Sequence, residues 1–263
     1  MSEVALILGG TKGLGRALAI EAVARGLAPV AVGRDSAAAA ADPELTGCLL
    51  QRADLSDLDE AAGLVDSLYS EGLLPEGQPL RYVFWVAATF IRRPVLTYSV
   101  EDVRRMVNTN LGGPVCAMAA IHRKMVELSH GDPEAETPVH WITIGSTSSW
   151  MVREYETLYC AVKSAKAHLT RNFTRELVRD LPGSKVTMVH PGGLKSPNWW
   201  KDLEQDTENY MELDVVARLI WDQVAGQSGR YREMLILRGQ DGTPKVDWGP
   251  QKPEGPFDFN PHV

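Results

Sequence analysis

The chain lacks the features that would mark a nucleic-acid-binding or membrane-spanning protein. Its net charge is -7 and its lysines and arginines are scattered, so no basic stripe is available for a phosphate backbone. No apolar run approaches the roughly 20 residues that a membrane-spanning helix needs. The opening residues MSEVALILGG have neither the cationic region nor the long apolar region of a signal peptide. We therefore expect neither nucleic acid nor a membrane among its partners.

Cysteine is scarce as well. The three cysteines, Cys48, Cys116 and Cys160, are far apart, odd in number and without the spacing of metal ligands. This pattern is typical of reduced thiols in a cytoplasmic protein, and it predicts no metal site.

Short apolar runs instead alternate with longer helical patterns along the 263 residues. The apolar runs predict strands at 4–8, 28–33, 47–55, 81–88, 139–146, 185–193 and 233–239. The helical patterns predict helices at about 14–24, 57–71, 100–129, 157–180 and 213–226, the third one interrupted near the sequence NLGGP. Apolar strands separated by helices are typical of a parallel sheet covered on both faces. We therefore predict an α/β fold of the Rossmann type, a single domain whose doubly wound parallel sheet has about seven strands.

The last part of the chain has a different composition. Residues 1–240 would form this single domain. Residues 241–263 are rich in Pro and Gly and lack periodicity. They predict an irregular tail that docks on a neighbour through Trp248 and Phe257.

A glycine-rich loop follows the first predicted strand and opens the first predicted helix. In LILGGTKGLGRALA the key positions are Gly9, Gly13 and Gly15. A phosphate can approach a backbone that carries no side chains, and the helix N-terminus offers N–H groups and a positive dipole end. The competing interpretation is a plain tight turn, but the position after the first strand of a βαβ pattern favours a dinucleotide site.

The second predicted strand ends in the sequence VGRD. Arg34 stands where an arginine suits the 2′-phosphate of NADP(H), and Lys12 adds a second cation in the glycine loop. Asp35 is one residue further on and would suit the ribose hydroxyls of NAD(H). NADP(H) is therefore the favoured cofactor, with NAD(H) as the second candidate.

A tyrosine and a lysine stand four positions apart in the predicted helix LYCAVKSAKAHLT. Tyr159 and Lys163 would share one helix face, which indicates either a solvated pair or a catalytic one. A phenol has an ordinary pKa near 10, so acid–base work near neutral pH needs its phenolate stabilised, and a nearby ammonium acts in that direction.

Together, the glycine spacing, Asp54, Asn110, Ser146 and the Tyr159–Lys163 pair resemble the short-chain dehydrogenase/reductases over about residues 3–200. The resemblance implies that Tyr159 donates a proton to a carbonyl, or accepts one in the reverse direction. It implies that Lys163 lowers the tyrosine pKa and holds the nicotinamide ribose, that Ser146 hydrogen-bonds the substrate oxygen, and that Asn110 anchors a water path. Other residues that could fill these places are Thr147, Ser148 and Ser149 for the serine, Tyr155 for the tyrosine and Asn108 for the asparagine.

The resemblance also implies a set of cofactor contacts. In chain order these are Gly9, Thr11, Lys12, Gly13, Leu14, Gly15, Arg34, Asp54, Leu55, Ala87, Ala88, Asn110, Tyr159, Lys163, Pro191, Gly192, Leu194 and Ser196. Asp54 and Leu55 would touch the adenine, and the sequence HPGGLKS would line the nicotinamide and the phosphates.

The substrate pocket is implied by two segments, 148–156 and a lid at about 195–212. Its residues would be Ser146, Trp150, Met151, Tyr159 and Trp199, with Trp200 beside them, and such a pocket suits an apolar or aromatic carbonyl or alcohol compound. Arg92 and Arg93 could bind an anionic substrate, but a solvated loop explains them equally well.

One stretch departs from the family pattern. Residues 86–89 read VAAT where the family has Asn-Asn-Ala-Gly. The departure leaves open an alternative function, an NADP(H)-binding sensor with little turnover, although binding alone does not require Ser146. Epimerases or dehydratases of the extended relatives are disfavoured because little chain remains after residue 200 for their substrate domain. The family resemblance further implies a homodimer or homotetramer formed through residues 110–129 and 157–180.

Overall fold

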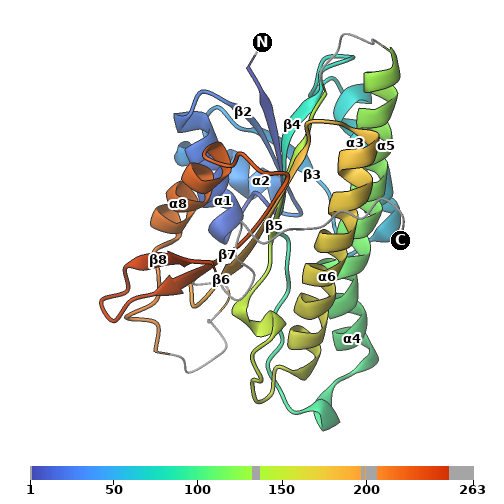
Figure 1. The fold of residues 1–263 in the computed structure, drawn as a ribbon. Helices are drawn as coiled ribbons and strands as arrows, with labels where there is room; N and C mark the ends of the chain where they lie inside the picture. The colour runs from blue at the N-terminus through green and yellow to red at the C-terminus, as the bar shows by residue number, and fades with distance from the viewer. Residues whose placement is uncertain (1, 132–136, 197–198, 200–205, 249–263) are drawn as a thin grey trace.

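A computed structural model describes residues 2–131, 137–196, 199 and 206–248. They form one sheet in the strand order β3-β2-β1-β4-β5-β6-β7-β8 (Figure 1). The strands are β1 Val4–Leu8, β2 Ala28–Gly33, β3 Leu49–Arg52, β4 Leu80–Trp85, β5 His140–Ile144, β6 Lys185–Pro191, β7 Tyr231–Arg238 and β8 Pro244–Asp247. All neighbours pair in parallel except β7 and β8, which are antiparallel.

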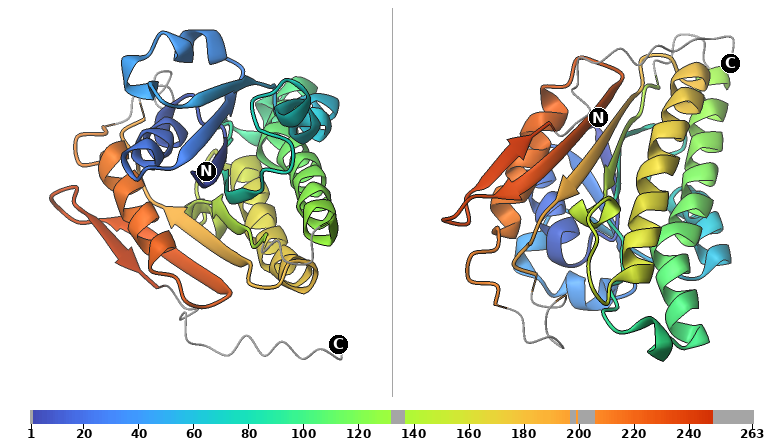
Figure 2. Two further views of the ribbon diagram at one scale, coloured as in Figure 1. Left: turned by 90° about the horizontal axis from the view of Figure 1, so that it is seen from above. Right: turned by 60° about the horizontal axis from the view of Figure 1, so that its bottom comes forward.

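Helices cover both faces of the sheet (Figure 2). They are α1 Gly13–Ala24, α2 Ser36–Ala40, α3 Leu58–Ser70, α4 Val100–Val107, α5 Gly113–Gly131, α6 Thr157–Asp180 and α8 Leu213–Ala225, with short turns η1 Pro43–Leu45, η2 Val95–Thr97 and η4 Thr147–Ser149. The chain is therefore a doubly wound α/β domain, as the alternation of apolar and helical patterns predicted. Among the described helices, none has both the length and the apolarity to cross a membrane.

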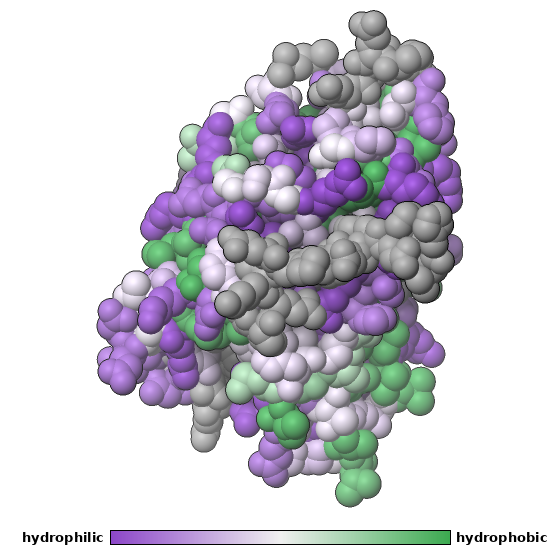
Figure 3. All heavy atoms as spheres, in the orientation of Figure 1, coloured by the Kyte–Doolittle hydropathy of each residue, from purple (hydrophilic) through white to green (hydrophobic). Residues whose placement is uncertain are grey.

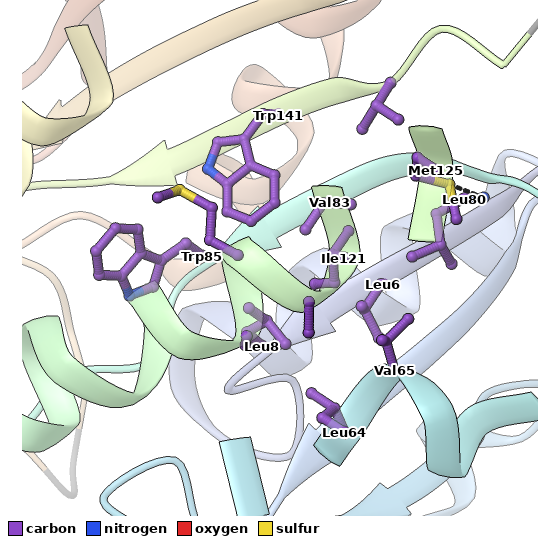
Figure 4. Packing of buried hydrophobic residues seen from close by; sticks show 14 of the residues in the cluster. Leu6, Leu8, Leu64, Val65, Leu80, Val83, Trp85, Ile121, Met125 and Trp141 are labelled. Atoms are coloured by element: carbon purple, nitrogen blue, oxygen red, sulfur yellow. Dashed lines mark hydrogen bonds between the residues drawn. The ribbon is translucent and has the colours of Figure 1, made fainter. Parts of the chain in front are cut away.

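Two cores follow from the alternation of side chains along buried strands. On one face, Leu6 and Leu8 of β1 pack with α3, α5 and two tryptophans, Trp85 and Trp141 (Figure 4). On the other face, Ala5 and Ile7 pack with α1 and α8. A strand buried on both sides has apolar residues at every position, which explains the continuous apolar runs in the sequence.

The predicted interruption of the third helix is present. A π-helical turn, η3 Asn108–Gly112, joins α4 to α5 without a loop. Such turns widen the backbone locally and are frequent at functional sites. Several predicted strands are too long, because the chain turns across the carboxyl edge of the sheet sooner than its apolar residues suggest. The fourth strand, for example, ends at Trp85 rather than at residue 88.

The prediction of an irregular tail from residue 241 was wrong for its first part. Residues Pro244–Asp247 form an eighth strand on the outer edge of the sheet. Pro244 starts this strand, where the missing N–H is tolerated at an edge. Trp248 packs on the same chain, with the Arg232 guanidinium 5.4 Å from its ring centroid, and its docking on a neighbour stays a prediction. Phe257 lies outside the described residues.

Candidate active site

The carboxyl ends of β1, β4, β5 and β6 meet at one edge of the sheet, where a doubly wound fold binds its ligands. The glycine loop follows β1, the VAAT segment follows β4, Ser146 follows β5 and Pro191 ends β6. The N-terminal half of α6 brings Tyr159 and Lys163 to the same edge. All of the predicted site segments that the structure describes are thus gathered here.

Two glycines of the loop, Gly9 and Gly15, leave no room for a side chain. Gly9 has φ +90°, and a Cβ there would lie 2.7 Å from the backbone nitrogen of Ala87. A Cβ on Gly15 would lie 1.9 Å from the carbonyl oxygen of Gly9. Lys12 precedes α1 and makes no side-chain capping hydrogen bond, so the first N–H groups of the helix remain available to an anion. This cradle fits a dinucleotide phosphate.

Two cations border the end of β2. Lys12 Nζ lies 2.6 Å from Asp35 Oδ2, and Arg34 Nη1 lies 3.8 Å from Asp54 Oδ2. The hydrogen bond and the charge of Lys12 lower the pKa of the Asp35 carboxyl, so this group is a carboxylate. Both cations are more than half exposed, which leaves them accessible to a phosphate group.

The predicted adenine contacts lie after β3. Asp54 Oδ1 accepts hydrogen bonds from Ser56 N and Oγ at 2.9 and 2.6 Å. Leu55 is buried, and Gly113 allows α5 to approach its carbonyl oxygen, because a Cβ on Gly113 would lie 1.8 Å from that atom.

The VAAT segment is held by the backbone and by Asn110. Val86 N and Ala87 N both donate to Leu8 O, at 3.0 and 2.7 Å. Asn110 Nδ2 donates to Thr89 O and to Met106 O, at 2.9 Å each. The side-chain oxygen of Asn110 is buried and has no hydrogen-bond partner among the described residues. The amide of Asn110 thus secures a turn that the family pattern would secure with its own asparagines.

Ser146 and Tyr159 lie together. Ser146 caps η4 by accepting a hydrogen bond from Ser148 N at 3.1 Å, and its side chain lies close enough to Tyr159 to act on the phenol. Burial of Tyr159 raises its pKa above the ordinary value, and the Ser146 side chain opposes this effect only in part. Tyr159 is therefore a neutral phenol, able to donate a proton.

The competing residues are engaged elsewhere. Ser148 Oγ donates to Glu156 Oε2 at 3.3 Å, and Ser149 Oγ donates to Lys163 O at 3.2 Å. Asn108 Nδ2 donates to Ser56 O at 3.1 Å. Tyr155 is 43% exposed and has φ 65°, outside α6.

Lys163 points to the backbone of β5 and not to the phenol oxygen. Its Nζ donates to Gly145 O at 3.2 Å and to Ile144 O at 3.4 Å, and it lies 5.5 Å from the ring centroid of Tyr159. Burial lowers the pKa of Lys163 to about 7.

An aromatic group covers Tyr159. The rings of Phe90 and Tyr159 meet edge to face, with their centroids 4.8 Å apart. The rings of Phe90 and Trp199 are stacked, with centroids 5.4 Å apart and 7° between the planes. The ring centroids of Trp199 and Tyr159 are 6.0 Å apart. Of the other predicted pocket residues, Trp150 and Met151 are about half exposed, and Trp150 contacts His190 and not Tyr159. Residues 197–198 and 200–205 of the predicted lid, Trp200 among them, lie outside the described residues.

Exposed apolar side chains surround this end of the molecule. Leu96 and Val152 are almost fully exposed, and Val95, Val100 and Met151 are about half exposed or more. The backbone joins the two segments that carry them, since Arg93 N donates to Tyr155 O at 2.9 Å. Figure 3 shows apolar residues at the lower end of the face drawn, in the region of α4 and η4.

A family model described as short chain dehydrogenase matches residues 3–207. The chain belongs to this family. As a short-chain dehydrogenase, it is an NAD(P)-dependent oxidoreductase that acts on alcohol and carbonyl groups.

Relatives and solved structures agree with this assignment. Galactitol 2-dehydrogenase of Agrobacterium fabrum (strain C58) is 26% identical over 203 residues, which cover 75% of this chain and 73% of that protein. A structure described as ElxO with NADP bound has a TM-score of 0.73 at 19% identity, covering 90% of this chain and 98% of the other. An alcohol dehydrogenase of Thermococcus sibiricus complexed with 5-hydroxy-NADP has a TM-score of 0.73 at 17% identity, covering 93% and 100%.

Sequence reasoning missed several buried polar residues of this dehydrogenase. Lys166 is fully buried, with Nζ 3.4 Å from Trp85 O and 4.2 Å from the centroid of the Trp85 indole. Its spacing of three residues from Lys163, on an otherwise small and apolar helix face, was the signal available. His190 and Glu233 were also missed, because their strands, KVTMVHP and YREMLILR, contain other polar residues and neither residue stands out.

Proposed function

We propose that this short-chain dehydrogenase uses NADP(H) and reduces the carbonyl group of an apolar or aromatic substrate, or oxidises the corresponding alcohol. The observation that carries the proposal is the position of the Ser146 side chain beside the Tyr159 phenol, next to the stacked rings of Phe90 and Trp199. It combines a proton donor, a donor to the substrate oxygen and an apolar cover in one place.

The preference for NADP(H) is supported by charge at the end of β2. A guanidinium grips a phosphate through two parallel hydrogen bonds, and Arg34 and Lys12 lie on either side of Asp35. Displacing Lys12 from Asp35 would place its ammonium on the 2′-phosphate. Two of the structural neighbours carry NADP or an NADP derivative.

The catalytic roles follow from the groups around Tyr159. When bound, the reduced nicotinamide supplies the hydride. Tyr159 donates its phenol proton to the substrate oxygen, and Ser146 hydrogen-bonds that oxygen as negative charge develops on it. Lys163 holds the nicotinamide ribose, and its ammonium stabilises the phenolate that proton donation leaves.

Asn110 supports the return of the proton. Its buried side-chain oxygen is an acceptor without a partner among the described residues, and such atoms normally bind an internal water. A water there would connect the interior beside Lys163 to solvent, which is the role the family resemblance implies.

The substrate class is supported by the covering side chains. The apolar side chains packed with Tyr159 are Phe90, Ile91, Met106, Val162 and Trp199. The polar and charged groups near it are those of Ser146, Arg153, Glu156, Cys160 and Lys163. An aromatic or branched aliphatic ketone satisfies these surfaces. The cytoplasmic location drawn from the separate cysteines stays a prediction.

The experiment compares oxidation of NADPH and of NADH by the wild type, Tyr159→Phe and Tyr155→Phe, over aromatic and aliphatic ketones, aldehydes and quinones. Loss of the proton donor should lower kcat by roughly 100-fold or more. Tyr155→Phe removes an exposed phenol only four residues away and should leave turnover intact. Activity that survives in Tyr159→Phe contradicts the assignment, and a wild type that binds NADPH but turns over no substrate favours the sensor function.

A further inference from the structure

A buried group of charges lies directly behind the catalytic serine. His190 and Glu233 are side by side on β6 and β7, with His190 Nε2 2.8 Å from Glu233 Oε1. In the parallel register Glu233 is opposite Met188, two residues before His190, so both side chains point to the same face of the sheet. The side chain of His190 is fully buried and that of Glu233 is 8% exposed.

The buried carboxylate of Glu233 accepts hydrogen bonds from two residues besides His190. Arg171 of α6 donates to both oxygens, at 2.9 and 2.6 Å, and Tyr231 donates to Oε2 at 2.5 Å. Burial alone would raise the pKa of Glu233, but the hydrogen bonds from His190, Arg171 and Tyr231 lower this pKa to about 2. Glu233 is therefore an acceptor at every oxygen.

The other side of the imidazole faces the active site. His190 Nδ1 lies 3.1 Å from the carbonyl oxygen of Ser146 and 3.5 Å from Ser149 Oγ. The approach depends on Gly145, since a Cβ there would lie 2.8 Å from Nδ1. The ring edge of Trp150 also meets the imidazole, with centroids 4.8 Å apart. Pro191 and Gly192, the predicted nicotinamide contacts, follow His190 in the chain.

Both ring nitrogens of His190 thus face acceptors. A carbonyl oxygen and a carboxylate can each only accept, and a histidine that donates at both nitrogens is an imidazolium. We propose that His190, as a buried imidazolium held by Glu233, is a positioning residue that fixes the backbone of Ser146 and the start of the nicotinamide turn relative to Tyr159. The inference rests on the proposed function, because it assigns the pair a role in that same reaction.

The composition Ser149–His190–Glu233 is that of a hydrolytic triad, but the geometry is not. Nδ1 is closer to Ser146 O than to Ser149 Oγ, and Ser149 Oγ donates to Lys163 O. An imidazole that already donates to a carbonyl has no lone pair at Nδ1 with which to accept a serine proton. The network therefore positions groups and does not activate Ser149.

The charge state is tested without turnover. Nitrogen NMR of labelled protein, with the His190 signal assigned by its loss in His190→Asn, should show both ring nitrogens protonated near neutral pH. A neutral tautomer in the wild type would overturn the proposal.

The positioning role is tested with Glu233→Gln, which keeps the shape and removes the charge. We expect kcat to fall roughly 10- to 100-fold while the Kd for NADPH changes by less than about threefold, because a small misplacement of reacting groups acts on the chemical step. His190→Asn retains a donor toward Ser146 O but no reach to Glu233, so it should keep more activity than His190→Leu, and adding Glu233→Gln to it should cost little more.

A matched control is His140→Asn on β5. His140 is the other buried histidine of the described sheet. It begins β5, whereas His190 lies near the end of β6, and it hydrogen-bonds Thr187. It should lower stability as much as His190→Asn and leave kcat unchanged. If both variants lose kcat in proportion to stability, His190 is merely structural.

If the wild type turns over no substrate, the proposed function fails, and the positioning claim is decided by amide hydrogen exchange. Exchange at Ser148 and Ser149 should then quicken in Glu233→Gln, and unchanged exchange refutes the role.

Discussion

At the scale of single residues, the site depends on side chains whose charge is set by burial or by one neighbour. Arg34 and Lys12 are exposed and form ion pairs with carboxylates, whereas Lys163 and Lys166 are buried beside backbone carbonyls. Sequence position alone predicts that the first pair meets the cofactor. The family resemblance predicts a role for Lys163 too, but only the structure shows the burial that decides the charge of Lys163 and Lys166.

Arg34 should determine the cofactor preference. Arg34→Ala removes a charged hydrogen-bonding partner of the 2′-phosphate, which is worth about 1.5–3 kcal/mol, or roughly 10- to 100-fold in the KM for NADPH. The KM for NADH should change little. The control is Arg52→Ala. Arg52 is an exposed arginine at the end of the adjacent strand β3, and it forms an ion pair with Glu60 of α3. Equal effects on both cofactors would refute the assignment.

Lys166 should reduce the stability of the fold. Its folded pKa lies well below the ordinary value, because burial and the nearby Lys163 disfavour the charge. The unfolded chain therefore binds more protons, so the cost is absent above the unfolded pKa and grows as the pH falls. Lys166→Met should raise the free energy of unfolding by about 1–2 kcal/mol, which corresponds to a rise in Tm of roughly 2–8 °C. The rise should be larger at about pH 6 than at about pH 9. Thermal unfolding measures this, with exposed Lys245→Met as control. A gain independent of pH would show that charge is not the cause.

At the scale of elements, the strands and helices could largely be predicted, because a parallel sheet buries both faces and leaves apolar runs. The eighth strand could not, since Pro244 and its polar neighbours have no such pattern. The His190–Glu233 pair escaped prediction for a related reason. The two residues are far apart in the chain, and only the pairing of β6 with β7 brings them together. The predicted catalytic residues Ser146 and Tyr159 do lie together, because their motifs sit at fixed places on β5 and α6.

The junction of η3 and α5 gives two adjacent glycines opposite roles. Gly113→Ala would drive a Cβ against Leu55 O, a backbone atom that cannot yield, so we expect a loss of about 1–3 kcal/mol and weaker NADPH binding. Gly112→Ala would place its Cβ 3.1 Å from Leu58 Cδ2, the end of a flexible side chain. There the gain in helix propensity should leave stability unchanged or raised by up to about 1 kcal/mol. Chemical denaturation of both variants distinguishes the two, and equal effects would contradict the packing argument.

At the scale of the whole molecule, α5 and α6 lie side by side along one face (Figure 1). A groove between them is lined by Leu111, Met118, Ala165, Leu169 and Phe173, among others. We infer that a second copy of the chain covers this groove in a homodimer or homotetramer. Ala165→Arg places a large charge on the exposed ridge of α6 and should shift the sedimentation profile to monomer at micromolar concentration. Ala225→Arg, on an exposed end of α8, should leave assembly unchanged. A wild type that already sediments as a monomer would refute the interface.

The stacking of Phe90 and Trp199 over Tyr159 has an optical consequence. The indole of Trp199 lies 6.0 Å from the ring of Tyr159, the residue that we propose acts beside the nicotinamide, and reduced nicotinamide absorbs light in the band where tryptophan emits. Bound NADPH should therefore quench this indole by energy transfer, and any displacement of the stack by substrate should change the colour of its emission. The difference between wild type and Trp199→Phe isolates that signal from the other tryptophans. Trp199 is thus expected to report cofactor binding by fluorescence before any substrate is known.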